Sequence, residues 1–273
     1  MKDRILRRLR LYAKRAGLRG ETQNFAVLCH QRSGSNMLTS IINQHPDIRL
    51  YGQLFKDDPD FRRRTDKMVG TAFTGQLFDD KLTTRDRFDL LEGNPGERED
   101  RNTEAYLHRF FRSLDRFYPA VRLGFKFHGG TLYRDEIKKL VLDKGYRTII
   151  LHREDLFAAA VSWYQAREFD RWVRVAERPA PKKTVELDVK KIKWFAEKTK
   201  KDVELWQELA AEYPQNTLEL TYEQITDPDF DFNKIWQFLE VKPLPNLKPR
   251  TKKLIKDYSH ITNLAEARRA VIV

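Results

Sequence analysis

Hydrophobic positions along the chain follow two patterns that alternate. Apolar runs bounded by polar turns predict strands at residues 25–29, 121–127, 146–152 and 217–220, and a short extended piece at residues 48–55. Between these runs, apolar side chains recur at helical spacing and predict helices, among them residues 103–118, 134–143, 156–167, 189–213 and 232–239. Strands that alternate with helices predict an α/β fold, with a mainly parallel central sheet and helices on both of its faces.

The length of the chain, 273 residues, suits one α/β domain with a full core. We expect a single domain over residues 21–273, preceded by a basic arm at residues 1–20. Residues 56–101 are rich in Asp, Arg and Lys and predict loops and short helices of an insertion over the edge of the sheet. A solvated arm packed on the body is the favoured interpretation of residues 1–20, and peripheral contact with lipid headgroups is the alternative.

The charge balance narrows the class of partner. Lys and Arg outnumber Asp and Glu by 52 to 40, and the formal net charge of +12 favours anionic partners such as nucleotides, acidic glycans or an anionic membrane surface. Nucleic acid is not expected, because the basic residues are interspersed with acidic ones. The single cysteine, Cys29, cannot form an internal disulfide, and no apolar run is long enough to span a membrane. These features predict a cytoplasmic protein, with membrane association through the arm as the alternative.

One stretch, residues 25–45, combines a strand, a short polar turn and a helix. Such a turn gathers backbone N–H groups and the positive end of a helix dipole, which together make an anion site. Arg32, Ser33, Ser35 and Asn36 add charge and donors, although an ordinary polar helix cap is the alternative. The phosphate loop G-x-x-x-x-G-K-[ST] is not present here, which disfavours an ordinary ATPase.

Polar residues also follow the other strands at their carboxyl ends. Ligands of parallel α/β sheets bind beyond these ends, so residues there are expected to gather on one edge. They are Arg32 with Ser33, His128, Arg153 and Tyr222. Two arginines, a histidine and a tyrosine at one edge predict a site for an anionic nucleotide.

The segment QRSGSNMLTSIINQHPDI resembles the 5′-phosphosulfate loop of sulfotransferases, which use 3′-phosphoadenosine 5′-phosphosulfate (PAPS). Asn36 stands where the family usually has a second hydroxyl residue. The resemblance implies a P-loop-NTPase-like sulfotransferase fold. It also implies that PAPS is bound by the loop residues Arg32, Ser33, Gly34, Ser35, Asn36 and Met37.

Two later motifs agree with this resemblance. LHREDLFAAAVSWY supplies an arginine and a serine, Arg153 and Ser162, at the places where the family contacts the 3′-phosphate of the nucleotide. LTYEQITDP is similar to a strand end in which the tyrosine, here Tyr222, lies near the adenine. The tail from Lys248 resembles the family's basic C-terminal loop, with further candidate phosphate contacts at Arg250, Lys252 and Lys253.

The catalytic groups are expected from the same resemblance. Arg32 would stabilise charge on the leaving phosphate. Its role is expected to be electrostatic, because an arginine does not readily donate a proton to a leaving group. Many relatives have a glutamate base where this chain has Gln53, whose amide cannot act as a base. FKFHGG resembles a Lys-x-His motif, so His128 is the expected base and Lys126 the expected contact of the transferring group. A turn histidine that caps the next helix is the alternative for His128.

The predicted activity is transfer of a sulfuryl group from PAPS to a hydroxyl (or amine) of an acceptor, a carbohydrate or a lipid-linked sugar, without a metal. The sequence does not indicate an oligomeric state. One alternative is a nucleotide-dependent kinase with a divergent loop, for which Asp155 and Glu223 are candidate magnesium ligands. A second alternative is a non-enzymatic basic module that binds nucleic acid or anionic lipid.

Overall fold

The protein was analysed as a computed structural model, which describes residues 23–53, 122–128, 145–169, 184–244, 247 and 258–271. The chain divides into two compact units, one of residues 1–27 and 45–148 and the other of residues 28–44 and 149–273. Several predictions lie outside the described residues. They are the arm at 1–20, the insertion at 56–101, the helices at 103–118 and 134–143, and the basic tail with Arg250, Lys252 and Lys253.

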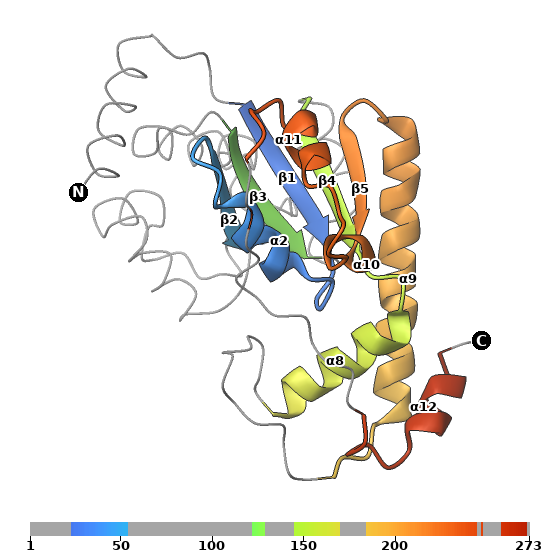
Figure 1. Ribbon diagram of the computed structural model, residues 1–273. Coiled ribbons are helices and arrows are strands. Elements are labelled where there is room, and N and C mark those ends of the chain that lie inside the picture. Colours follow the sequence, from blue (N-terminus) through green and yellow to red (C-terminus); the bar gives the residue numbers. More distant parts are fainter. Residues whose placement is uncertain are drawn as a thin grey trace, which may run out of the picture. The chain divides into compact units, whose positions relative to one another are not determined.

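Five strands form a single sheet (Figure 1). They are β1 (Gln23–Cys29), β2 (Ile48–Gln53), β3 (Arg122–His128), β4 (Arg147–His152) and β5 (Thr217–Thr221), in the order β2-β3-β1-β4-β5. The prediction of an α/β fold with a mainly parallel sheet is confirmed. The strand order reverses about β1, and ligands of such sheets bind beyond the strand ends at this kind of reversal.

Two local features shape the sheet around β3, a register shift against β2 and a glycine beside a ring of β1. The two strands pair in parallel, and their register shifts between Leu50 and Gln53, close to the predicted break at Gly52. The shift places the backbone of Gln53 opposite Lys126. In β3, a Cβ atom at Gly124 would lie 2.3 Å from Phe25 Cζ, so only glycine lets the β1 ring pack there.

Three of the described helices begin at or within one residue of their predicted positions, at residues 156, 189 and 233, whereas the short helix at residues 222–225 was not predicted. The described helices are α2 (Ser35–Ile42), α8 (Leu156–Glu168), α9 (Val189–Glu212), α10 (Tyr222–Ile225), α11 (Asn233–Phe238) and α12 (Leu264–Arg269). Local capping fixes two of these starts. Asp155 accepts a hydrogen bond from the N–H of Ala158, and Asp188 does the same for Lys191. None of the described helices is both long and apolar enough to cross a bilayer.

Helices α8, α9 and α12 share one apolar cluster within the second unit. Trp163 of α8 stacks on Phe195 of α9 with ring centroids 4.7 Å apart, and Ala267 of α12 is fully buried beside them. Consecutive alanines of α8, Ala158 to Ala160, are also buried. Because α8 is packed on most of its sides, the position of each polar residue along it is well defined.

Candidate functional site

The connection between β1 and α2 turns sharply through two left-handed residues. Arg32 has a φ of 69° and Gly34 a φ of 85°. Gly34 is the N-cap of α2 and has no side chain to bond the first turn, so the positive end of this helix faces the loop. A Cβ atom at Gly34 would lie 2.7 Å from Cδ2 of Tyr222, so the Tyr222 ring packs directly against the loop.

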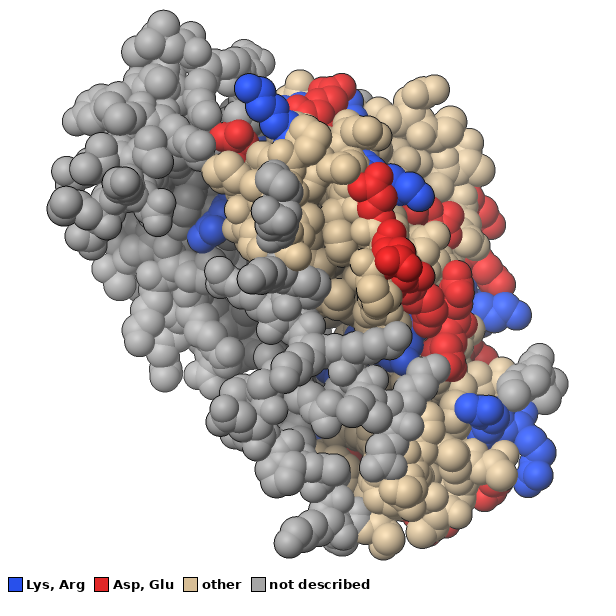
Figure 2. Space-filling model, viewed as in Figure 1, with Lys and Arg blue, Asp and Glu red and all other residues tan. Residues whose placement is uncertain are grey.

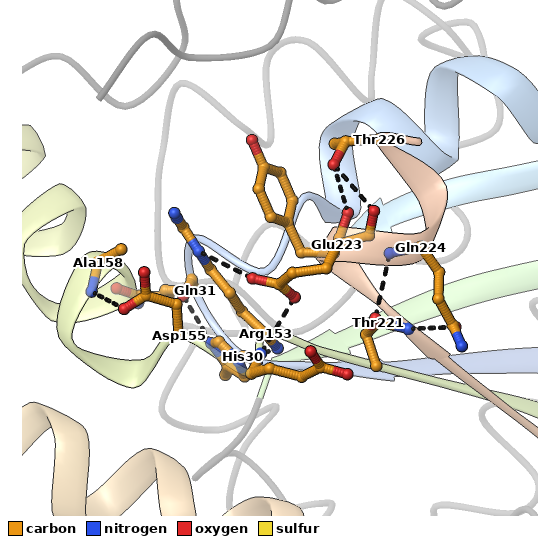
Figure 3. Close-up of polar contacts among 11 residues, drawn as sticks. His30, Gln31, Arg153, Asp155, Ala158, Thr221, Glu223, Gln224 and Thr226 are labelled. Carbon is orange, nitrogen blue, oxygen red and sulfur yellow. Dashed lines mark hydrogen bonds and ion pairs between the residues drawn. The ribbon is translucent and has the colours of Figure 1, made fainter. Parts of the chain in front are cut away.

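His30 and Ser33 hold this loop from inside. Ser33 is fully buried and donates from its hydroxyl to the carbonyl oxygen of His30, at 2.9 Å. The ring of His30 lies 2.8 Å from the carbonyl oxygen of Gln31 through Nδ1, and its Nε2 lies 3.1 Å from the backbone nitrogen of Arg153 (Figure 3). A carbonyl only accepts and an N–H only donates, so these partners assign the ring proton to Nδ1.

The same environment keeps His30 neutral. Burial lowers its pKa from 6.5 to about 4, against the opposing effect of the Gln31 carbonyl. The positive charge of Arg153 acts in the same direction as burial. A proton on Nε2 would also point at the N–H of Arg153, which already uses that nitrogen as its acceptor.

Arg153, just beyond the end of β4, is 5 % exposed. Its guanidinium carbon lies 4.5 Å from the centroid of the Tyr222 ring, and its Nε lies 3.8 Å from Oε1 of Glu223. Glu223 is itself held, because its Oε2 accepts from the N–H of Glu154 at 3.1 Å (Figure 3). The buried Nε of Arg153 makes no hydrogen bond with any described residue, which leaves a fixed donor suited to an anionic ligand.

Arg32 and Ser162 meet at this site. Nε of Arg32 donates to the hydroxyl oxygen of Ser162 at 2.9 Å, across 130 positions of sequence. Burial lowers the pKa of the Arg32 guanidinium from its ordinary value, and the charge of Arg153 adds to that effect. A half-buried guanidinium whose charge is disfavoured by a second, buried arginine makes the site favourable for an anion.

A capping box places Tyr222. The Thr221 hydroxyl accepts from the N–H of Gln224 at 3.1 Å, and the Gln224 side chain accepts from the N–H of Thr221 at 2.9 Å. The helix α10 therefore starts immediately after β5, and Tyr222 is its first residue. The sequence T-Y-E-Q carries this capping signal, which was not among the predicted helix starts.

The second unit thus brings together Arg32, Ser33, Gly34, Arg153, Ser162 and Tyr222 from four separate segments. The other predicted loop residues lie in the first turn of α2, where Ser35 is buried, Asn36 is exposed and Met37 is half-buried. The sequence analysis missed His30, whose partner Arg153 lies 123 positions away. It considered Glu223 only as a magnesium ligand, whereas this carboxylate holds Arg153.

Lys126 and His128 belong to the other unit. Lys126 is buried within β3, and His128 is half-buried as the last residue of that strand. The sequence analysis had placed His128 in a turn, because two glycines follow it. The strand instead runs through His128. The roles predicted for these two side chains stay predictions.

The carboxylates proposed for a kinase have other partners here, since Asp155 caps α8 and Glu223 contacts Arg153. Among the described residues, no three His, Cys, Asp or Glu side chains form a metal-holding group. On the face drawn in Figure 2, Lys and Arg side chains are scattered and a band of Asp and Glu side chains runs between them. The described residues on that face form no extended basic surface of the kind that binds nucleic acid.

The low pKa of His30 predicts a pH-dependent stability. The unfolded chain protonates this histidine near pH 6.5, and the folded chain protonates it only near pH 4. Its contribution is complete above about pH 6.5 and is lost as the pH falls toward about 4. We expect the free energy of unfolding of the wild-type chain to fall by about 2 kcal/mol more than that of His30→Gln between about pH 7 and about pH 5. Urea titrations at both pH values measure this, and equal losses would contradict the assignment.

Gly34→Ala should destabilise the protein for two reasons, the positive φ and the contact with Tyr222. Gly145→Ala is a matched control, because Gly145 has a φ of 68° but nothing within 4 Å of an added Cβ. We expect the control to cost about 1 kcal/mol of unfolding free energy and Gly34→Ala about 1–3 kcal/mol more. Thermal and urea unfolding measure both, and equal losses would show that the ring does not press on the loop.

Most of the chain resembles known proteins in sequence pattern and in fold. A sequence model described as "Sulfotransferase family" matches residues 25–245. A search of curated protein sequences gave no match. Three solved structures with similar folds are described in turn.

The sulfotransferase domain from the curacin biosynthetic pathway is 11 % identical, with 83 % of this chain and 77 % of that chain covered and a TM-score of 0.48. A sulfotransferase from Mycobacterium avium is 14 % identical, with 86 % and 69 % covered and a TM-score of 0.49. A mouse sulfotransferase complexed with PAP is 15 % identical, with 92 % and 64 % covered and a TM-score of 0.46. Because the family match spans most of the chain and includes the loop, α8 and α10, the chain belongs to the sulfotransferase family.

Proposed function

We propose that this enzyme transfers a sulfuryl group from PAPS to a hydroxyl (or amine) of an acceptor, a carbohydrate or a lipid-linked sugar. The observation that carries the PAPS site is the buried Nε of Arg153, which has no hydrogen-bond partner among the described residues. It lies in the unit that also contains the loop after β1 and the Arg32–Ser162 pair. Family membership supports sulfuryl transfer in general.

The residues divide into three binding roles. Arg153 and Ser162 are assigned to the 3′-phosphate, because one offers a buried Nε without a hydrogen bond to any described residue and the other a hydroxyl beside Arg32. The 5′-phosphosulfate is assigned to the loop, including Ser33, Gly34, Ser35, Asn36 and Met37 at the N-terminus of α2. Tyr222 is assigned to the adenine, since its ring is fixed between the loop and Arg153.

In the proposed reaction the sulfuryl group passes directly from PAPS to the acceptor, and the protein forms no covalent bond to it. PAPS supplies the sulfuryl group, and adenosine 3′,5′-bisphosphate leaves. The acceptor oxygen forms a bond to sulfur as the bond from sulfur to the bridging phosphate oxygen breaks, and the acceptor loses its proton to a base. Arg32 stabilises the negative charge that develops on the leaving phosphate, which it does as a fixed cation and not as a proton donor.

We assign proton removal to His128 and contact with the transferring group to Lys126. These residues are two apart in β3, so their side chains project from the same face of that strand. Gln53 pairs with Lys126 through the backbone and cannot serve as a base. The segment 56–101 is assigned to the acceptor pocket. Trp163, expected from the sequence to help shape that pocket, is instead buried against Phe195 in the cluster of α8, α9 and α12. A cytoplasmic location completes the proposal, with membrane contact through residues 1–20 as the alternative.

Arg153→Ala should weaken the binding of adenosine 3′,5′-bisphosphate by about 10–100-fold, the loss expected for charge-assisted hydrogen bonds. Binding of 5′-AMP, which lacks the 3′-phosphate, should change by less than about threefold. Arg269→Ala is the control, because Arg269 is exposed on α12. Calorimetry measures all three proteins, and an unchanged bisphosphate affinity for Arg153→Ala would remove this arginine from the 3′-phosphate site.

His128→Ala should abolish sulfuryl transfer, by about 10²–10⁴-fold in kcat, and leave bisphosphate affinity within a few fold. The acceptor for this assay comes from incubating the protein with labelled PAPS and a cell extract, then identifying the sulfated product. Wild-type turnover in the variant would show that another group takes the acceptor proton.

A further inference from the structure

His30 is a buried titratable residue for which the proposed chemistry has no use. Its ring is 3 % exposed and sits between the loop after β1 and the residue that follows β4. We propose that His30 is a positioning residue that holds the two phosphate-binding segments at a fixed separation. This proposal rests on the proposed function, in which the loop takes the 5′-phosphosulfate and Arg153 takes the 3′-phosphate.

The first support is the geometry of the ring itself. Nδ1 is held by the carbonyl oxygen of Gln31, immediately before Arg32, and Nε2 accepts from the backbone N–H of Arg153. The two nitrogens belong to one planar ring, so no rotatable bond lies between the two contacts. The backbone of His30 is also anchored, because its carbonyl oxygen accepts from the buried hydroxyl of Ser33.

The second support is the cost of losing the contact. The N–H of Arg153 is buried, so an apolar side chain at position 30 would leave it without its acceptor. The backbone of Arg153 would then move relative to the loop, although its guanidinium would still contact Tyr222 and Glu223. Arg153 could still bind a phosphate, but the distance between Arg153 and the loop would no longer be fixed.

The third support is electrostatic. A neutral imidazole can bridge segments that carry Arg32 and Arg153, whereas a cationic side chain in the same place would add a third positive charge. Burial and the charge of Arg153 both favour the neutral ring, in agreement with the hydrogen-bond pattern. The residue therefore supplies a connection without competing with the ligand for the arginines.

Substitution of His30 by Gln or by Asn tests its contacts with Arg153 and Gln31 separately. The Gln carboxamide reaches as far as Nε2 of histidine and can accept from Arg153, whereas the Asn carboxamide reaches only as far as Nδ1. His30→Gln should therefore keep the connection to Arg153, and His30→Asn should lose it while keeping the contact with Gln31. His260→Asn is the control, because His260 is half-buried in the same unit and bonds Gln165 outside the site.

The experiment compares three ligands by calorimetry, namely adenosine 3′,5′-bisphosphate, 5′-AMP and 3′-AMP. His30→Asn should weaken the bisphosphate by about tenfold or more and each monophosphate by less than about threefold. The reason is that each phosphate subsite still forms alone, and only their alignment is lost. His30→Gln should restore most of the bisphosphate affinity, and His260→Asn should leave the ratio of the three affinities unchanged.

Each other result has a defined meaning. Equal losses for all three ligands in His30→Asn, or an unchanged bisphosphate affinity, would overturn the positioning role and leave the proposed function standing. Failure of the wild-type chain to bind the bisphosphate would overturn the proposed function and this role with it. If His30→Asn does not fold, His30→Gln decides, since a loss there as large as that of Arg153→Ala would contradict the role assigned to Nε2.

Discussion

The burial of the Arg153 guanidinium is the constraint on which the rest of the site depends. A cation removed from water must be compensated, and here a ring at 4.5 Å and a carboxylate at 3.8 Å compensate it only in part. Its Nε makes no hydrogen bond with any described residue, and a second arginine, Arg32, lies close enough for the charge of Arg153 to lower the pKa of Arg32. Folding already dehydrates and orients these groups, so the binding of an anionic ligand does not have to supply that free energy.

The surrounding residues follow from that constraint. Glu223 is tied to the N–H of Glu154, and the capping box starts α10 so that Tyr222 faces Arg153. The Tyr222 ring in turn leaves no room for a side chain at residue 34. Glycine suits this position both for that reason and because of its positive φ. His30 connects the backbone of Arg153 to the loop, so Arg153 is held through its backbone as well as through its guanidinium.

Local sequence patterns predicted much of this arrangement. The buried run of β4 was predicted to within one residue, and the first residue of α8 was predicted as the structure has it, because such signals lie within a few residues of each other. The grouping of Arg32, Arg153 and Tyr222 followed from strand order, a rule of parallel sheets. The contact of His30 with Arg153 could not be predicted, because it depends on packing between residues 123 positions apart. His128 was predicted to lie one residue beyond the strand, because two glycines follow it, whereas β3 includes it as its last residue.

A crystal structure of the protein with adenosine 3′,5′-bisphosphate is the most direct test of the central claim. The account predicts a 3′-phosphate oxygen at about 3 Å from Nε of Arg153, with Ser162 also in contact and the 5′-phosphate on the loop after β1. It also predicts that Tyr222 keeps its place over the guanidinium. A nucleotide bound elsewhere, without contact to Arg153, would contradict the claim that this buried arginine binds the 3′-phosphate.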